Sequence, residues 1–273
     1  MAWDRQITIK SKAELEIMRQ AGRINAEALA AAKNAIRPGA STADVNAAAE
    51  EVLHKHGVYS PFKNYPGAYP YPASTCVSVN EELVHGIPSK GRKLKEGDIV
   101  TVDCGTVFEG FVADSAFTCG VGAVSELVGK LLAVTEESLY VGIRQMTVGN
   151  HVGDVSAAIQ QYVESRGFHV TREYTGHGVG RAMHEGPQVP NYGTPGRGLA
   201  LREGITLALE PMVLIKSWQT RVTPDEWTVV SADGLPTAHF EHSVAVTENG
   251  PFILTAWDEE STSLSGRKEQ QQV

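Results

Sequence analysis

Apolar residues recur at helical spacing near the start of the chain, between Ser11 and Arg37. The positions in this pattern are Leu15, Met18, Gly22, Ile24, Ala28 and Leu29. Residues three and four apart lie on one face of an α-helix, so the spacing predicts an amphipathic helix. Ser11 and Glu14 stand three positions apart at its start, which is the spacing of a capping box.

A second helix is predicted directly after the Pro38-Gly39 turn. The segment STADVNAAAEEVL resumes helical spacing near Ser41 or Thr42 and runs toward Gly57. Glycine commonly follows a helix C-terminus because it adopts left-handed backbone angles without strain. The first part of the chain is therefore predicted to be two helices joined by a short turn.

The same order of elements recurs further along the chain. Residues 36–57 resemble residues 146–167, and the shared positions are Gly39 and Gly149, Asp44 and Asp154, Val45 and Val155, and Gly57 and Gly167. A helical pattern at 125–144 precedes the second copy. We predict a duplication with halves at about 12–122 and 123–256, related by a pseudo-twofold axis. Chance similarity between helix-turn-helix segments is the alternative.

Two alternating stretches flank a Phe108-Glu109-Gly110 turn and predict a β-hairpin with Asp103 and Asp114 on opposite arms. Partners in an antiparallel pair have a constant sum of residue numbers, and a two-residue loop makes that sum odd. Both aspartates then lie on one face, directly opposite or one diagonal step apart. A cation between them would offset the cost of burying two like charges. A solvent-facing polar pair is the alternative.

The second half repeats this arrangement with glutamates. Glu210 ends ITLALE as Asp103 ends DIVTVD, and Glu241 in HFEHSVAVT takes the position that Asp114 has in FVADSAFTC. Apolar neighbours on both strands make freely solvated glutamates less favourable. We therefore predict that four carboxylates face one another across the junction of the halves.

Three histidines stand in glycine-rich surroundings. His177 lies among Gly176, Gly178 and Gly180 in YTGHGVGRAMHEGP, where the backbone can approach closely, so its imidazole can join the carboxylates. Four carboxylates and one imidazole can hold two divalent ions. His184 in the same segment is a candidate donor to the substrate or to another site residue. Taken singly, each of these histidines is explained equally well by a structural role and by a functional one. The same applies to His85 in VHGIP.

Composition limits the class of protein. Of the 273 residues 42% are hydrophobic and 21% charged, which is typical of a soluble globular protein. The net charge of −8 and the lack of Lys/Arg clusters argue against nucleic-acid binding, and no apolar run reaches the roughly 18 residues that span a membrane. Three cysteines without CxxC spacing favour a reducing cytoplasm. We predict one domain at 1–257 and a polar, disordered tail at 258–273.

Five segments together resemble the type I methionine aminopeptidases, over about residues 8–256. They are CVSVNEELVHGIP, VDCGTVFEGFVAD, GHGVGRAMHEGPQVPNYG, LALEPM and FEHSVAVTENGPFILT. The resemblance implies an α+β pita-bread fold, in which two related αβ halves surround a curved antiparallel sheet with helices on its outer face.

The resemblance also assigns roles to residues. Asp103 would bind one metal, Asp114 and Glu241 would bridge two, and His177 and Glu210 would bind the other. The two divalent ions would be Co, Mn, Fe or Zn, and the water between them would attack the carbonyl after the first residue. Glu210 would also move the proton, His184 would polarise that carbonyl, and His85 would contact the scissile amide nitrogen. The residues implied to contact the substrate are His85, Tyr71, Cys76, Met183, His184 and Trp227.

The implied substrate is a nascent polypeptide or peptide with a free N-terminal methionine and a small second residue. The resemblance also implies that the protein acts in the cytoplasm, at the ribosome, as a monomer. An X-Pro aminopeptidase or prolidase would share the five ligands, although those enzymes generally carry an additional N-terminal domain and HGIP favours the methionine enzymes. A noncatalytic binding protein on the same scaffold is the second alternative, and such proteins typically lose metal ligands.

Overall fold

The computed structural model describes residues 7–258 and residue 262. Two pairs of helices pack together, α1 with α2 and α3 with α4. Their bounds are α1 Lys12–Ala35, α2 Thr42–Lys55, α3 Glu126–Ile143 and α4 Val152–Glu164. The predicted helices are confirmed, whereas most of the predicted disordered tail lies outside the described residues.

The capping residues begin the helices where the sequence predicted. Ser11 accepts a hydrogen bond from the Glu14 amide, and the Glu14 side chain accepts one from the Ser11 amide at 2.9 Å. Ser41 and Asp44 make the same reciprocal pair at the start of α2. Each pair satisfies two amides that have no partner inside the helix. Gly57 follows α2 with a φ of 67°, as expected for its position.

An eight-stranded sheet has the order β1-β3-β4-β13-β8-β6-β7, with β14 paired to β13, and every pairing is antiparallel. Its strands are β1 Thr75–Val79, β3 Ile99–Phe108, β4 Phe111–Gly120, β6 Thr175–Gly178, β7 Glu185–Pro190, β8 Thr206–Leu209, β13 Glu241–Thr247 and β14 Gly250–Ile253. The β4–β13 pair joins the two predicted halves into one sheet.

Two smaller three-stranded sheets adjoin this one, with orders β10-β11-β2 and β12-β9-β5. Their strands are β2 Glu82–Val84, β5 His169–Val170, β9 Met212–Leu214, β10 Thr220–Val222, β11 Val229–Ser231 and β12 Thr237–His239. Strands β10 and β11 form an antiparallel hairpin.

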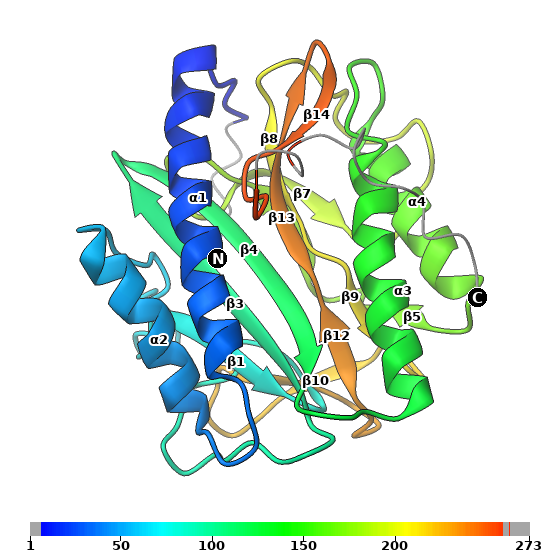
Figure 1. The fold of residues 1–273 in the computed structure, drawn as a ribbon. Helices are drawn as coiled ribbons and strands as arrows, with labels where there is room; N and C mark the ends of the chain where they lie inside the picture. Colours follow the sequence, from blue (N-terminus) through cyan, green and yellow to red (C-terminus); the bar gives the residue numbers. More distant parts are fainter. Residues whose placement is uncertain (1–6, 259–261, 263–273) are drawn as a thin grey trace.

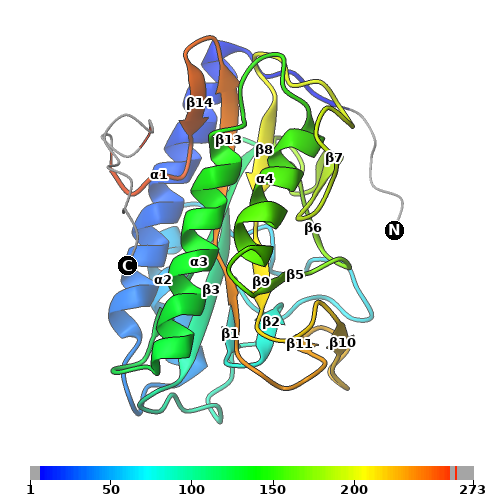
Figure 2. The same cartoon turned by 90° about the vertical axis from the view of Figure 1, so that its right-hand side faces the viewer.

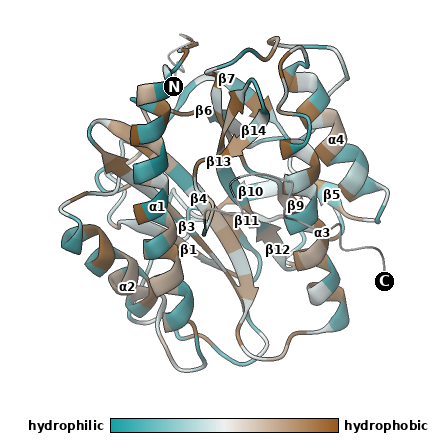
Figure 3. Ribbon diagram, turned by 45° about the horizontal axis from the view of Figure 1, so that its top comes forward, coloured by the Kyte–Doolittle hydropathy of each residue, from teal (hydrophilic) through white to brown (hydrophobic). Residues whose placement is uncertain are grey.

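All four helices lie on the same side of the large sheet (Figures 1 and 2). The helices carry hydrophilic and hydrophobic residues in turn, as expected when one face packs on a core (Figure 3). Val102 and Cys104 of β3 pack in the cluster that contains Ala28, Leu29 and Leu53 of α1 and α2. Because side chains alternate across a strand, Asp103 between them points to the opposite face.

The same alternation holds in the part of the sheet that α3 and α4 cover. Leu207 and Leu209 of β8 join the core under α3 and α4, while Ala208 faces away from it. The helix-free face of the sheet thus carries apolar side chains such as Ala208 as well as the polar side chain of Asp103. Within the described residues, the structure has no helix that is both long and apolar enough to cross a bilayer.

Candidate metal centre and active site

Strand register places four of the predicted site residues in one row across the sheet. Cys76 of β1 is paired with Asp103 of β3, and Asp103 is paired with Ala116 of β4. Ala116 is also paired with Glu241 of β13 on its other side. Directly paired residues in a sheet point to the same face. Cys76, Asp103 and Glu241 therefore project from one face, and Glu210 follows β8 at the position that would oppose Glu241.

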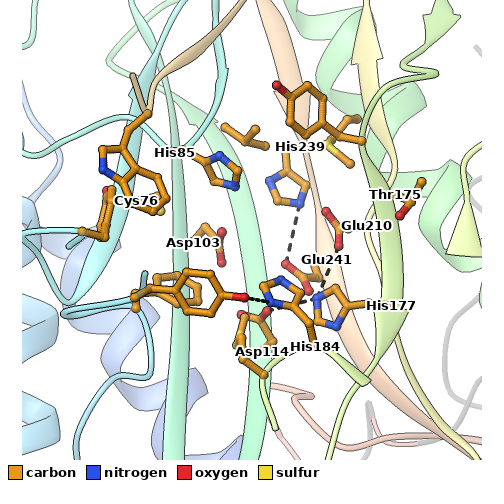
Figure 4. Close-up of a pocket in the computed structure, with 18 of the residues that line it drawn as sticks. Cys76, His85, Asp103, Asp114, Thr175, His177, His184, Glu210, His239 and Glu241 are labelled. Carbon is orange, nitrogen blue, oxygen red and sulfur yellow. Dashed lines mark hydrogen bonds and ion pairs between the residues drawn. The ribbon is translucent and has the colours of Figure 1, made fainter. Parts of the chain in front are cut away.

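Asp114 and His177 complete the group from neighbouring positions. Asp114 is paired with Gly105, so it lies one diagonal step from Asp103, one of the two arrangements that the hairpin predicted. His177 of β6 is paired with Ala208, two residues before Glu210. The His177 Nε2 atom lies 3.7 Å from an Asp114 oxygen and 3.5 Å from Glu210 Oε1. Five strands thus bring the predicted ligands to one place (Figure 4).

These carboxylates are largely removed from the surface of the protein. Asp114, His177 and Glu241 are buried, and their ligand atoms lie within 4.8 Å of one another. Burial raises the pKa of Asp114 to about 7, and it raises the pKa of Glu210 and of Glu241 well above the ordinary value. Burial and the neighbouring Asp114 do the same to the pKa of Asp103. In each case removal from water disfavours the charged form.

The site fits a divalent cation. Asp103 Oδ1, Asp114 Oδ1 and Glu241 Oε1 are buried oxygens without a hydrogen-bond partner among the described residues. Buried acceptors without a partner are rare in proteins, and a cation would satisfy all three. Oxygen-rich donors with one imidazole suit Mn, Fe, Co or Zn.

The imidazole of His177 is held in the form that binds metal. Its Nδ1 lies 2.9 Å from the carbonyl oxygen of Gly178, which can only accept a hydrogen bond. This contact places a proton on Nδ1, and it directs Nε2 toward Asp114 and Glu210. A ligating histidine is commonly oriented by such a bond from its other nitrogen.

A cavity of about 420 Å³ extends from this cluster. All the site residues that the sequence predicted line it, namely Tyr71, Cys76, His85, Asp103, Asp114, His177, Met183, His184, Glu210, Trp227 and Glu241. Tyr71 is almost fully buried and its hydroxyl donates to the Gly86 carbonyl at 2.9 Å. Its ring meets that of Trp227 edge to face, with centroids 5.2 Å apart. The structure shows this proximity, while the individual roles stay predictions.

His85 and His184 both line the cavity, and the ring of His184 lies beside that of His177, with centroids 4.4 Å apart (Figure 4). Burial lowers the pKa of His85 to about 4 and that of His184 to about 3, so both rings are neutral near pH 7. His85 has a φ of 61°, an uncommon backbone angle for this residue type and one that tends to mark functional sites. The Tyr65 hydroxyl lies 2.6 Å from Nδ1 of His184.

Residues 16–248 match the pattern of one known protein family along most of the chain. This protein belongs to metallopeptidase family M24. The four helices and the curved antiparallel sheet are the pita-bread fold that the sequence predicted. An M24 assignment agrees with the buried Asp, His and Glu group, since the family description itself specifies a metal-dependent peptidase.

Individual relatives show which members of the M24 family this chain is similar to in sequence and fold. A methionine aminopeptidase of Clostridium acetobutylicum is 48% identical over 249 residues, covering 91% of this chain and 98% of the relative. The crystal structure of methionine aminopeptidase from Thermotoga maritima matches with a TM-score of 0.89 and 49% identity, covering 92% of this chain and 99% of that one. A prolidase from Pyrococcus furiosus shares the fold alone, with a TM-score of 0.73, 23% identity and coverage of 91% and 65%.

Several cavity residues of this M24 protein were not predicted from the sequence. They include Phe62, Tyr65, Tyr174, Met212 and His239. His239 stands two positions before Glu241, and strand alternation could have placed it on the same face; its Nε2 is 3.6 Å from a Glu241 oxygen. Tyr65 comes from an irregular loop, where no periodic pattern indicates the direction of a side chain.

Proposed function

We propose that this protein is a metal-dependent methionyl aminopeptidase that releases the N-terminal methionine of peptides and nascent chains, preferring a small second residue. The observation that carries the proposal is the meeting of Asp103, Asp114, His177, Glu210 and Glu241 at one end of a largely apolar cavity. The high identity to methionine aminopeptidases over almost their whole length supports it.

Two divalent ions are the cofactor that suits this cluster. Asp103 would bind one ion, His177 and Glu210 would bind the other, and Asp114 and Glu241 lie centrally enough to contact both. The unpartnered oxygens of Asp103, Asp114 and Glu241 support this assignment. When bound, such ions supply Lewis-acid activation of water and of the substrate carbonyl.

The side chains around the cluster divide the remaining tasks. Glu210 lines the cavity beside His177 and can accept and return a proton during hydrolysis. Neutral His184 can donate a hydrogen bond to the carbonyl oxygen as negative charge develops there. His85, across the cavity, can contact the scissile amide nitrogen.

The apolar part of the cavity fits the methionine side chain. Tyr71, Cys76, Met183 and Trp227 line it together with Phe62. A thioether is unbranched and polarisable and packs favourably against aromatic rings. The edge-to-face pair of Tyr71 and Trp227 supplies such rings without a charge that would need solvation.

The partner that fits this activity is a polypeptide with a free N-terminus, met as it leaves the ribosome. The fitting location is therefore the cytoplasm, and a monomer suffices because one chain supplies every residue of the proposed site.

Peptide selectivity and a ligand variant test the proposal together. With Mn²⁺ or Co²⁺ added, we expect release of Met from Met-Ala-Ser and no turnover of Ala-Pro-Ala. Asp114→Asn should lower kcat/KM by more than about 100-fold, since it removes a central ligand rather than a supporting contact. Turnover of only Ala-Pro-Ala would establish the X-Pro alternative. Tight metal binding with no turnover of either peptide would favour a noncatalytic binding protein.

A further inference from the structure

The loop that carries Met183 and His184 is held by a buried ion pair. It joins β6 to β7 and spans residues 179–184. Glu185, the first residue of β7, folds its carboxylate back under this loop. Its Oε1 accepts hydrogen bonds from the amides of Arg181 at 2.7 Å and Ala182 at 3.2 Å. One side chain thus satisfies two consecutive loop amides directly before Met183.

The second oxygen of the same carboxylate is bound from far along the chain. Glu185 Oε2 lies 2.6 Å from Lys10 Nζ, and it also accepts a hydrogen bond from the Thr8 hydroxyl. The side chains of Lys10 and Glu185 are only 4% and 8% exposed. A buried pair with several hydrogen bonds loses much of its stabilisation when one partner is removed, because a charge is left alone.

In residues 7–10 the polar side chains are more buried than the apolar ones. This pattern indicates that polar contacts hold the segment in place. Ile7 and Ile9 are 40% and 54% exposed, whereas Thr8 and Lys10 point inward. The apolar side chains, which would gain most from burial, face solvent. The segment is therefore oriented by its polar contacts with Glu185 and not by a hydrophobic core.

Two glycines make room for this arrangement. A Cβ atom on Gly180 would lie 2.4 Å from Lys10 Cε and 2.6 Å from Glu185 Oε1. A Cβ atom on Gly204 would lie 2.5 Å from the Lys10 carbonyl oxygen, and the Gly204 carbonyl accepts from the Lys10 amide at 2.8 Å. The chain around Lys10 is thus fitted closely between two separate turns.

We propose that Lys10 and Glu185 form a clamp that positions the 179–184 loop, and through it His184, for the reaction. The inference rests on the proposed function, because it concerns the carbonyl donor of that reaction. Lys10 and Glu185 are positioning residues that act through His184 and leave the carboxylate cluster in place. Thr8 supports the clamp from the same segment.

Kinetics of Lys10→Met and Glu185→Gln test the clamp. Both should lower kcat for Met-Ala-Ser by about 10- to 100-fold, since a small misplacement of a reacting group can cost about 100-fold. Affinity for Mn²⁺ should stay within about twofold of wild type by titration calorimetry. Lys12→Met is the matched control. It removes an exposed ion pair with Glu248, in which Lys12 is 81% exposed, and should change neither quantity.

A double-mutant cycle separates positioning from general damage. In a His184→Ala background, which lacks the imidazole that the clamp is proposed to position, adding Lys10→Met should cost less than about twofold further. An equal loss from Lys10→Met in both backgrounds would overturn the proposal, as would a loss of Mn²⁺ affinity. If Lys10→Met fails to fold, Thr8→Val and Lys10→Arg weaken the same contacts, and the cycle is run with them.

Imidazole NMR gives a readout that is independent of turnover. Long-range ¹H–¹⁵N spectra, with His184 assigned by comparison with His184→Gln, should show shifted or broadened His184 signals in Lys10→Met and unchanged His151 signals. Unchanged His184 signals would overturn the clamp. If the wild-type protein releases no methionine the proposed function fails, while the spectra still decide whether the clamp orders His184.

Discussion

At the scale of single residues, the site combines carboxylates that resist ionisation with histidines that resist protonation. Asp114 has a pKa raised by burial to about 7, while burial lowers the pKa of His85 to about 4 and of His184 and His239 to about 3. The carboxylates and the histidines change the stability of the folded protein in opposite directions as pH rises. They do so over different pH ranges, so the two contributions can be measured separately.

The sign of each effect follows from which state holds more protons. An acid whose pKa is raised on folding keeps its proton in the folded chain, so its stabilisation is greatest at low pH and is lost as pH rises. A histidine whose pKa is lowered on folding has the opposite effect: the stability of the folded protein decreases as pH falls below about 6.5, because the unfolded chain then binds the additional proton. Above that pH the histidines are neutral in both states, and the carboxylates dominate.

We predict that the metal-free protein loses stability as pH rises above about 6.5, with the contribution of Asp114 ending near its pKa of about 7 and those of Asp103, Glu210 and Glu241 continuing above it. Each proton kept only by the folded chain contributes a slope of about 1.4 kcal/mol per pH unit. Urea unfolding of chelated protein at several pH values measures the slope. Asp114→Asn should reduce the slope below about pH 7, because the amide does not ionise, and saturating Mn²⁺ should remove it. A metal-free protein with no such slope would contradict the raised pKa values.

The residue scale also shows where sequence reasoning stops. Asp103, Asp114, Glu210 and Glu241 could be predicted because each interrupts an alternating apolar strand, where a lone carboxylate is costly. Tyr65 had no such signal. It reaches His184 from a loop, and only the folded chain brings residues that far apart in the sequence into contact.

At the scale of elements, local rules predicted most boundaries. Helices α1 and α2 begin at their capping residues, because the cap satisfies amides that the helix itself cannot. The hairpin rule placed Asp103 and Asp114 on one face but left their offset open. The observed turn centres on Glu109 and Gly110, both with positive φ, and this sets Asp114 opposite Gly105.

Two helical glycines provide a matched test of element packing. A Cβ atom on Gly22 of α1 would lie 2.0 Å from the Leu254 carbonyl oxygen, whereas one on Gly129 of α3 would meet nothing within 4 Å. Gly129→Ala should therefore raise the free energy of unfolding by about 0.4–1 kcal/mol. Gly22→Ala should lower it by about 1–3 kcal/mol through overpacking.

Denaturant unfolding of the metal-loaded variants measures both effects. The two substitutions add the same methyl group to a helix interior, so helix propensity favours both equally. If the two variants change the free energy of unfolding in opposite directions, the difference comes from the close contact between α1 and the chain at Leu254. If both variants were stabilised, α1 would not pack against that segment as closely as the structure shows.

At the scale of the whole molecule, the proposed metal site depends on the joining of two parts of the chain. Asp103 and Asp114 come from β3 and β4, while His177, Glu210 and Glu241 belong to the second part. The β4–β13 pair is where these parts meet. The proposed duplication accounts for the symmetry of the ligands, because each copy would supply two carboxylates at equivalent positions.

The sequence could predict this convergence because the same pattern occurred twice. The Lys10–Glu185 clamp could not be predicted in that way. It joins residues 175 positions apart and has no periodic or repeated sequence pattern to reveal it. Long-range contacts between irregular segments are determined by the complete fold, so they are the last to be accessible from sequence.

Hydrogen exchange tests whether the two parts act as one metal site. A ligand held at about 100 times its Kd stabilises the folded state by about 2.7 kcal/mol. Because the proposed ligands come from both parts, Mn²⁺ should slow amide exchange in β3 and β4 as well as in β8 and β13. Asp114→Asn should lose the protection in all four strands. Protection confined to one part would mean that the ions bind without bridging β4 and β13, and the two-part site would then be wrong.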